Sequence, residues 1–183
     1  MLSKFKESRS GFTLVELLTS IFIIALISGV FMANYHVTNE KNKLDLAAQE
    51  LASNIRLAQN YALGSKEFNG SIPVGGWGVE ISYNDVIYKI FADLDNSMHS
   101  WGAPVDEDFQ VIDLPNGMRI NTNNCSGGLD YGMANIVFIP PDPETILWSD
   151  NDGLTNEICI DLNDVSGRIK TIKINKFGLI DIQ

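Results

Sequence analysis

Residues 12–33, FTLVELLTSIFIIALISGVFMA, form an apolar run of 22 residues that only one charge, Glu16, interrupts. As an α-helix, at about 1.5 Å per residue, the run would be about 33 Å long, which matches the hydrocarbon thickness of a bilayer. The apolar region of a secretory signal is shorter, about 7–15 residues, and ends at a small-residue cleavage site. The following GVFMANY offers no convincing site of that kind. The run therefore predicts a membrane-spanning helix.

The residues ahead of the run, MLSKFKESRSG, are polar and carry a net charge of +2. Lysine and arginine beside a spanning helix favour the cytoplasmic side of the membrane. We therefore expect a cytoplasmic N-terminus and an extracytoplasmic remainder. The charge difference is small, because Lys41 and Lys43 follow the run on its other side.

The segment after the run keeps a helical pattern. Between residues 39 and 64 the apolar side chains recur at intervals of four and three, on Leu44, Ala48, Leu51, Ile55, Ala58 and Ala62. No proline interrupts residues 12–64, and Gly64 is a suitable helix stop. We expect one long helix, with residues 12–33 in lipid and an amphipathic half, residues 34–64, packed on a soluble head.

The head, residues 65–183, has the pattern of about eight short β-strands separated by turn residues. Three turns, at Asn84-Asp85, Pro115-Asn116-Gly117 and Lys176-Phe177-Gly178, each predict a hairpin. The segments 92–108 and 140–153 are expected to be long loops. The predicted fold class is α+β, a long helix packed on a β-rich, sandwich-like head.

The charge of the head argues against nucleic acid as a general partner. Subtracting the +2 of the leader and the −1 of Glu16 from the net charge of −10 leaves −11 for residues 34–183. So acidic a surface repels phosphate backbones and favours solubility. Cationic partners or a divalent metal would suit it better.

Two cysteines, Cys125 and Cys159, both lie in the head. If the head is outside the cytoplasm, a disulfide between them is expected. Closing that loop would stabilise the fold by about 3–4 kcal/mol in the chain-entropy model. The alternative is a pair of buried free thiols.

Glu16 needs a partner, because a carboxylate at the centre of a bilayer costs about 2.5–3.5 kcal/mol, and less near the ends. Cleavage just ahead of Phe12 would create an amino group close to Glu16. In a stack of identical helices, the Glu16 of one chain could neutralise the amine of its neighbour. The charge would then be satisfied only in the assembly, which would fix the register of the subunits.

The motif GFTLVE after a short basic leader, followed by an apolar helix, resembles the signal of type IV pilins and type II secretion pseudopilins. The resemblance implies a pilin-like lollipop fold and removal of residues 1–11 by a membrane-embedded prepilin peptidase, with cleavage after Gly11. It also implies N-methylation of the new terminal residue, Phe12, and a role for Glu16 in assembly. The expected partners are other pilins, the inner-membrane assembly platform and membrane lipid.

Within the head, ELASNIRLAQNYALGS, GGWGVEI, YKIFADLDNS and the terminal GRIKTIKINKFGLIDI resemble segments of H-type minor pseudopilins and pilus-associated minor pilins. Two features depart from that pattern. Gln59-Asn60 stands where the family often has arginine, and residues 121–156 match nothing in it.

Three further residue groups suggest other chemistry. The acidic turns with Asp150 and Asp152, and with Asp93 and Asp95, resemble calcium loops, although neither fits the twelve-residue pattern, so plain acidic turns are the alternative. A basic strand with Arg168, Lys170 and Lys173 suggests DNA binding, as in competence pilins that take up DNA. Its alternative is a lysine-protected edge strand. No nucleophile, zinc or nucleotide motif is present in the sequence, so we expect no catalytic residues and no resident cofactor.

The sequence thus predicts a single-pass inner-membrane subunit that assembles into a secretion pseudopilus or a type IV pilus. The alternatives are a DNA-uptake pilin and an anchored extracytoplasmic protein that never polymerises.

Overall fold

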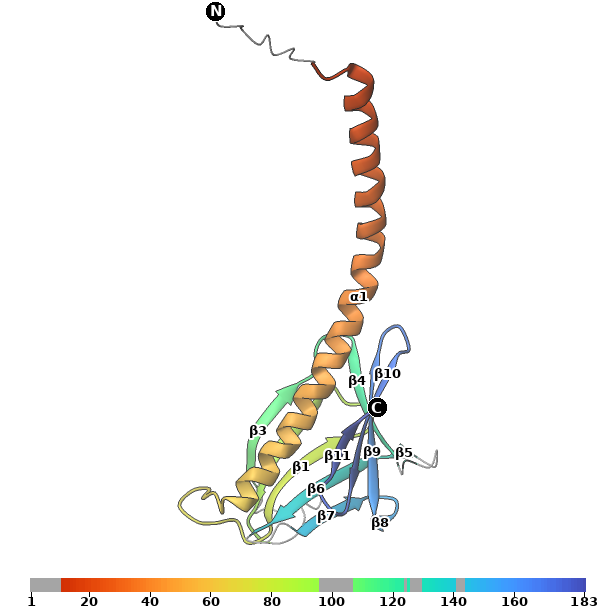
Figure 1. Ribbon diagram of the computed structural model, residues 1–183. Coiled ribbons are helices and arrows are strands. Elements are labelled where there is room, and N and C mark those ends of the chain that lie inside the picture. Colours follow the sequence, from red (N-terminus) through yellow and green to blue (C-terminus); the bar gives the residue numbers. More distant parts are fainter. Residues whose placement is uncertain (1–10, 96–106, 124, 126–129, 141–143) are drawn as a thin grey trace, which may run out of the picture. The chain divides into compact units, whose positions relative to one another are not determined.

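Helix α1, Leu14–Leu63, runs for 50 residues and contains no proline (Figure 1). It is described here in a computed structural model that covers residues 11–95, 107–123, 125, 130–140 and 144–183, with backbone only at residues 33–40 and 130. The chain divides into two compact units, Met1–Lys41 and Asn42–Gln183, and α1 contributes to both. Most of the leader, residues 1–10, lies outside the described residues.

The end of α1 differs in one detail from the prediction. The helix does stop at Leu63, but the amide of Gly64 still donates to the Asn60 carbonyl at 2.9 Å. The residue in the left-handed region is Ser65, with φ of 46°, and the amide of Lys66 then closes the end by donating to the Tyr61 carbonyl at 2.9 Å. These bonds satisfy backbone groups that a helix end otherwise leaves unpaired.

Where the structure describes the first unit, it contains one helical stretch that is long and apolar enough to cross a membrane. Leu14–Met32 has a mean hydropathy of 2.4, and none of its 19 residues is buried within the chain. Large apolar side chains cover this stretch on every side, from Leu14 to Met32. A helix that is apolar all round needs an apolar environment such as lipid or other helices.

In the second unit, the predicted apolar stripe of α1 is confirmed. Leu44, Ala48, Leu51, Ile55, Ala58 and Ala62 are all buried, with exposed fractions of 3% or less. Ala47 and Ala52 beside the stripe are buried too, and their small side chains allow the helix to lie close to the strands. The stripe forms the centre of the core.

The described part of the head contains two antiparallel sheets. The first has the order β3-β2-β1-β6-β7-β8, and the second has the order β11-β10-β9-β4-β5. The strands of the first sheet are β1 (Gly76–Ser82), β2 (Ile87–Asp93), β3 (Glu107–Asp113), β6 (Met133–Ile139), β7 (Glu144–Ser149) and β8 (Gly153–Leu154). Those of the second are β4 (Met118–Asn123), β5 (Asp130–Tyr131), β9 (Glu157–Asp164), β10 (Ile169–Asn175) and β11 (Ile180–Ile182).

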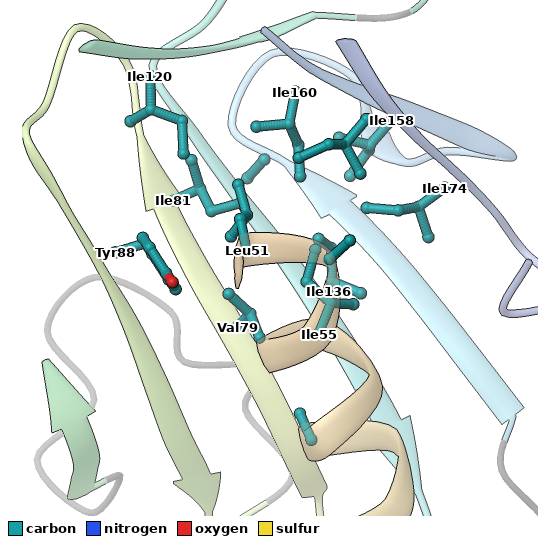
Figure 2. Close-up of a cluster of buried hydrophobic side chains, with 14 of the residues drawn as sticks. Leu51, Ile55, Val79, Ile81, Tyr88, Ile120, Ile136, Ile158, Ile160 and Ile174 are labelled. Carbon is teal, nitrogen blue, oxygen red and sulfur yellow. The ribbon is translucent and has the colours of Figure 1, made fainter. Parts of the chain in front are cut away.

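One hydrophobic core joins the helix to both sheets (Figure 2). Leu51 and Ile55 of α1 lie among inward-facing residues of the first sheet, including Val79 and Ile136, and of the second, including Ile160. At its margin, the Asn54 amide donates to the Tyr88 hydroxyl at 2.7 Å. Burial raises the pKa of Tyr88 to about 12, so the phenol stays neutral. The predicted α+β class, with a long helix and a β-rich head, is confirmed.

Two predicted hairpins are confirmed and one is wrong. β1 and β2 pair across Asn84-Asp85, and β10 and β11 pair across Lys176–Gly178. At Pro115–Gly117 the turn does form, but β3 pairs with β2 in the first sheet whereas β4 pairs with β9 in the second. The chain therefore changes sheets at this turn, which local turn chemistry does not reveal.

The predicted loop at residues 140–153 is also wrong in part, because it contains β7, which pairs with β6 along its length. The inward-facing residues of β7 are Thr145, Leu147 and Ser149, all buried. Two of these three residues are polar, so the sequence of β7 lacks the alternation of apolar and polar residues that is typical of a strand. In the other predicted loop, residues 96–106 lie outside the described residues.

A cluster of aromatic rings closes the core at the end of α1. Tyr61, Phe68, Trp77 and Phe109 meet edge to face, with ring centroids 5.0–6.3 Å apart. The Lys66 ammonium lies 3.5 Å from the centroid of the Tyr61 ring and 4.4 Å from that of Phe109. The Trp77 indole donates to the Lys66 carbonyl at 3.1 Å. Cation–π and ring contacts therefore fix the first residues after the helix.

Candidate functional site

The N-terminal end of α1 is organised by Thr13 and Glu16. The Thr13 amide donates to Glu16 Oε2 at 3.1 Å, and the Thr13 hydroxyl donates to the same oxygen at 3.0 Å. In return, the Glu16 amide donates to Thr13 Oγ1 at 3.3 Å. This reciprocal arrangement is a capping box, which satisfies amides that the start of a helix leaves unpaired. The positive end of the helix dipole adds to the stabilisation of the carboxylate.

The capping box holds Glu16 in one orientation while leaving it accessible. Both hydrogen bonds from Thr13 reach Oε2, and within the described residues Oε1 has no hydrogen-bond partner. Glu16 is solvent-exposed in the isolated chain. The site can therefore accept a further donor, such as an ammonium group from another molecule, without giving up its own hydrogen bonds.

Two other polar side chains in the apolar stretch are satisfied by the helix itself. The Thr19 hydroxyl donates to the carbonyls of Val15 and Glu16 at 3.0 Å, and the Ser20 hydroxyl donates to the Glu16 carbonyl at 2.7 Å. Such back-bonding lets hydroxyl groups lie in a lipid environment. Glu16 is the charged group of this stretch, and its carboxylate can still take an outside partner.

Gly11 and Phe12 precede the helix in a non-helical segment. Phe12 is 81% exposed, and among the described residues no atom lies within 4 Å of the position that a side chain on Gly11 would take. The described part of the fold therefore does not demand a glycine at position 11. A requirement for it would come from an external partner.

A family model for the prokaryotic N-terminal methylation motif matches residues 7–32. The match covers the N-terminal segment alone, and it supports the resemblance of that segment to type IV pilins and pseudopilins. Pilins of this family are structural subunits, and a single apolar N-terminal helix with this motif fits a single-pass membrane protein. No curated protein and no solved structure matches the chain in the corresponding comparisons.

Sequence reasoning selected Glu16 for this site but missed Thr13. The signal was present, because a threonine three residues ahead of a glutamate, just before an apolar run, is the capping-box spacing.

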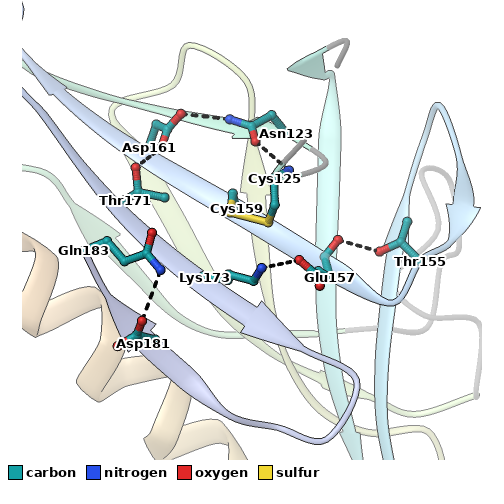
Figure 3. The surroundings of a disulfide bond; sticks show 10 residues. All are labelled: Asn123, Cys125, Thr155, Glu157, Cys159, Asp161, Thr171, Lys173, Asp181 and Gln183. Carbon is teal, nitrogen blue, oxygen red and sulfur yellow. Dashed lines mark hydrogen bonds and ion pairs between the residues drawn. A yellow bond between two sulfur atoms is a disulfide. The ribbon is translucent and has the colours of Figure 1, made fainter. Parts of the chain in front are cut away.

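Cys125 and Cys159 are joined by a disulfide with a Cα–Cα distance of 5.0 Å (Figure 3). It links the segment after β4 to β9, a central strand of the second sheet. Around it, Asp161 accepts hydrogen bonds from the Asn123 amide at 2.8 Å and from the Thr171 hydroxyl at 2.6 Å. These polar contacts hold three neighbouring strands in register on the same face of the sheet.

The three cations proposed for DNA binding each have an acidic partner. Arg168 Nε donates to Asp164 Oδ2 at 2.6 Å, and Lys170 Nζ lies 3.5 Å from Asp45 Oδ1 on α1. On the other face of β10, Lys173 forms an ion pair with Glu157 (Figure 3). The strand therefore carries positive groups whose charge is offset locally, on a head that is acidic overall.

The acidic turns are tied to their neighbours by hydrogen bonds. Asp150 Oδ1 accepts from the Gly132 amide at 2.9 Å, and Asp152 Oδ2 accepts from the Tyr131 hydroxyl at 3.0 Å. Burial, together with the Asp152 carboxylate, raises the pKa of Tyr131 to about 12.

At the other predicted calcium turn, Asp93 is buried at the end of β2 and Asp95 follows it. Within the described part of the chain, no three His, Cys, Asp or Glu side chains are grouped to hold a metal ion. Calcium binding at either turn stays a prediction.

Proposed function

We propose that this chain is a filament subunit, a minor pilin or pseudopilin that a prepilin peptidase cleaves after Gly11. In this proposal Phe12 becomes the methylated N-terminus and Glu16 pairs with the terminal amine of a neighbouring subunit. The observation that carries the proposal is the geometry of Glu16. Thr13 holds its carboxylate at the start of an apolar helix, and among the described residues the other carboxylate oxygen, Oε1, has no hydrogen-bond donor.

The two states of the subunit differ in how the charge of Glu16 is satisfied. In the membrane pool, the capping box and the helix dipole lower the cost of placing the carboxylate near the lipid surface. In the filament, the amine of a neighbour supplies an opposite charge in a low-dielectric environment, where charge pairing is strong. Apolar side chains from Leu14 to Met32 exchange lipid contacts for contacts between helices.

We further propose that the head lies outside the cytoplasm and the N-terminus inside it, in the inner membrane. The Cys125–Cys159 disulfide supports this orientation, since disulfides persist in oxidising compartments. The basic leader supports it as well. The other partners in this proposal are the inner-membrane assembly platform and further pilins of the same filament.

Among filaments, we favour a type II secretion pseudopilus with this chain in the H-type position. The support is the resemblance of the head segments around β1, β2 and the terminal β10–β11 hairpin. DNA uptake, the alternative, gains no support from the structure, because Arg168, Lys170 and Lys173 are all paired with carboxylates.

The first test is the intact mass and N-terminal fragmentation of the protein purified from its own membranes. We expect a chain that starts at monomethylated Phe12. A chain that still starts at Met1, in cells with active prepilin peptidase, would mean that the motif serves only as an anchor.

The second test separates processing from assembly. Glu16→Ala and Thr13→Ala should both be inserted in the membrane, and Glu16→Ala should be absent from sheared filaments. Thr13→Ala removes a helix cap worth about 1 kcal/mol and should assemble at an intermediate level, with Thr13→Ser restoring it. Ser20→Ala, which loses only a bond to its own helix, is the control. Normal filament levels of Glu16→Ala would exclude the proposed role of this residue.

A further inference from the structure

The β1–β2, β3–β4 and β9–β10 turns meet at one end of the head, and Figure 1 shows the last two of them there. The Asn84 amide of the first turn donates to a carbonyl of β4 at 2.8 Å. β4 begins beside the third turn, because Met118 pairs with Asp164. Lys170, just after the third turn, lies 3.5 Å from Asp45 of α1. We call this surface the entry end, since α1 enters the head there.

Aliphatic side chains are exposed on the entry end. Val165, in the β9–β10 turn, is 79% exposed, Ile169 is 58% exposed and Val86 is 45% exposed. The turn that carries Val165 is held in shape by the Asp164 carboxylate, which accepts from two backbone amides of the turn at 2.8 and 3.0 Å. Apolar groups that are fixed in this way lose little conformational entropy when they bind.

The charge of the entry end differs from that of the rest of the head. Residues 41–45, 84–86, 113–119 and 163–170 contain five Lys or Arg side chains and four Asp side chains, so these segments carry a net charge of +1. The other residues of the range 34–183 therefore carry −12. Two of the four aspartates also pair with cations of the same end. An anionic lipid surface repels most of the head but not this end.

The covalent chain brings the entry end to the bilayer. Only residues 33–41 separate Met32, the last residue of the apolar stretch, from Asn42, where the unit that contains the head begins. A segment of this length reaches about 35 Å at most when fully extended, and about 15 Å as a helix. A head tethered so closely meets the lipid surface at a high effective concentration, so weak contacts are enough to hold it there.

Exposed apolar side chains occur at the other end of the head as well, so apolarity alone does not indicate lipid. Phe177, in the β10–β11 turn, is 81% exposed. It lies at the end of β10 that is remote from the entry end. The tether to the membrane span and the difference in charge are what favour the entry end.

We propose that the entry end of the head docks on the surface of the bilayer that α1 spans. Val165 and Ile169 enter the layer just below the headgroups, and Lys41, Lys43 and Arg119 contact anionic headgroups. Docking holds the head of an unassembled subunit in one orientation at the membrane. The proposal rests on the membrane placement in the proposed function, and not on assembly into a filament.

The test uses the full-length chain, highly diluted in phosphatidylcholine vesicles with or without phosphatidylglycerol. Ser166→Cys carries a bimane label in the exposed β9–β10 turn, and a nitroxide on the lipid acyl chains quenches the label on contact. The two native cysteines are joined to each other, so the new thiol is the one that reacts. The matched control is Phe177→Cys, at the far end of β10 and about 20 Å away. We expect strong quenching at position 166 in the vesicles with phosphatidylglycerol, and several-fold weaker quenching at position 177.

Substitutions read through the label at position 166 separate the two kinds of contact. Lys41→Gln with Arg119→Gln should lower the ratio of docked to undocked heads by about fivefold for each charge removed. Val165→Asp should lower it by about tenfold or more, because an aliphatic group no longer leaves water. Val165→Leu keeps the apolar contact and should dock like the unchanged protein. A similar loss in Val165→Leu would mean that the shape of the turn, and not lipid contact, is what the label reports, and would overturn the inference.

Three other results would overturn the inference. These are absent quenching at position 166, equal quenching at positions 166 and 177, and quenching that does not depend on phosphatidylglycerol. A response at position 166 that appears only as the ratio of protein to lipid rises would show that the entry end binds a second copy of the chain instead of lipid.

Failure of this inference is distinguishable from failure of the filament proposal. Glu16→Ala should dock normally, since docking requires the membrane span alone. If docking fails while Glu16→Ala is absent from sheared filaments, the docking inference is wrong and the filament function stands. If Glu16→Ala assembles normally, the filament proposal fails whatever the label at position 166 reports.

Discussion

At the scale of single residues, Asp164 shows how burial and hydrogen bonding act in opposite directions on the pKa of a carboxyl group. Its side chain is almost fully buried, with 2% exposed, and its hydrogen bonds fix the turn that carries Val165. Burial alone would raise the pKa of Asp164. The hydrogen bonds from Arg168 and Ser166 and the charge of Arg168 outweigh burial, so the pKa lies below its usual value.

The sign of the resulting pH dependence follows from that shift. An unfolded aspartate titrates near pH 3.9, above the folded value, so the unfolded chain binds the proton more readily. The stability that Asp164 contributes is present above about pH 4 and is lost as the pH falls through the folded pKa. We expect the urea midpoint of the detergent-solubilised protein to fall in this acid range, and to fall less in Asp164→Asn. Equal acid sensitivity in both proteins would contradict this account.

At the scale of elements, stability depends on the amphipathic half of α1. Ile55 is fully buried where the helix meets both sheets, whereas Leu46 on the same helix is 63% exposed. Ile55→Ala should lower the free energy of unfolding by about 2–5 kcal/mol, because it removes buried methyl groups and leaves a cavity. Leu46→Ala, the matched control, should change it by about 0.5 kcal/mol or less. Urea unfolding in detergent measures the free energy of unfolding of both variants. Similar losses in the two variants would contradict the central place of Ile55 in the core.

The helix and strands also show which parts of the fold could be predicted from the sequence. The stripe from Leu44 to Ala62 and the hairpin at Asn84-Asp85 were predictable, because periodicity and turn chemistry are local properties. The change of sheet after Pro115 was not, since it depends on which distant strand β4 joins. β7 was missed because Thr145 and Ser149 are polar at inward positions.

The residues of the candidate site were likewise predictable from the sequence only in part. Glu16 stood out as a lone charge in an apolar run, and Thr13 was recognisable in principle from its spacing. The partners of Arg168, Lys170 and Lys173 were not, because Asp45 is far from them in sequence.

At the scale of the whole molecule, charge decides which macromolecules the head can approach. Residues 34–183 carry a net charge of −11, and the cations of β10 are paired. We expect no salt-dependent binding of a fluorescent DNA duplex to the purified protein in fluorescence anisotropy at about 0.15 M salt. Binding that weakens with salt, and is lost in Arg168→Ala with Lys170→Ala, would instead support the DNA-uptake alternative.

The ring cluster at the end of α1 has an optical consequence. Trp77 is fully buried and edge-on to three other rings, so its indole sits in a fixed, asymmetric environment. Near-ultraviolet circular dichroism depends on such fixed packing and disappears when tertiary packing is lost, even where helix and strand content survives. The indole is thus a built-in spectroscopic marker of the junction between the helix end and the first sheet. Its signal would distinguish a head that has merely collapsed from one that has docked its helix.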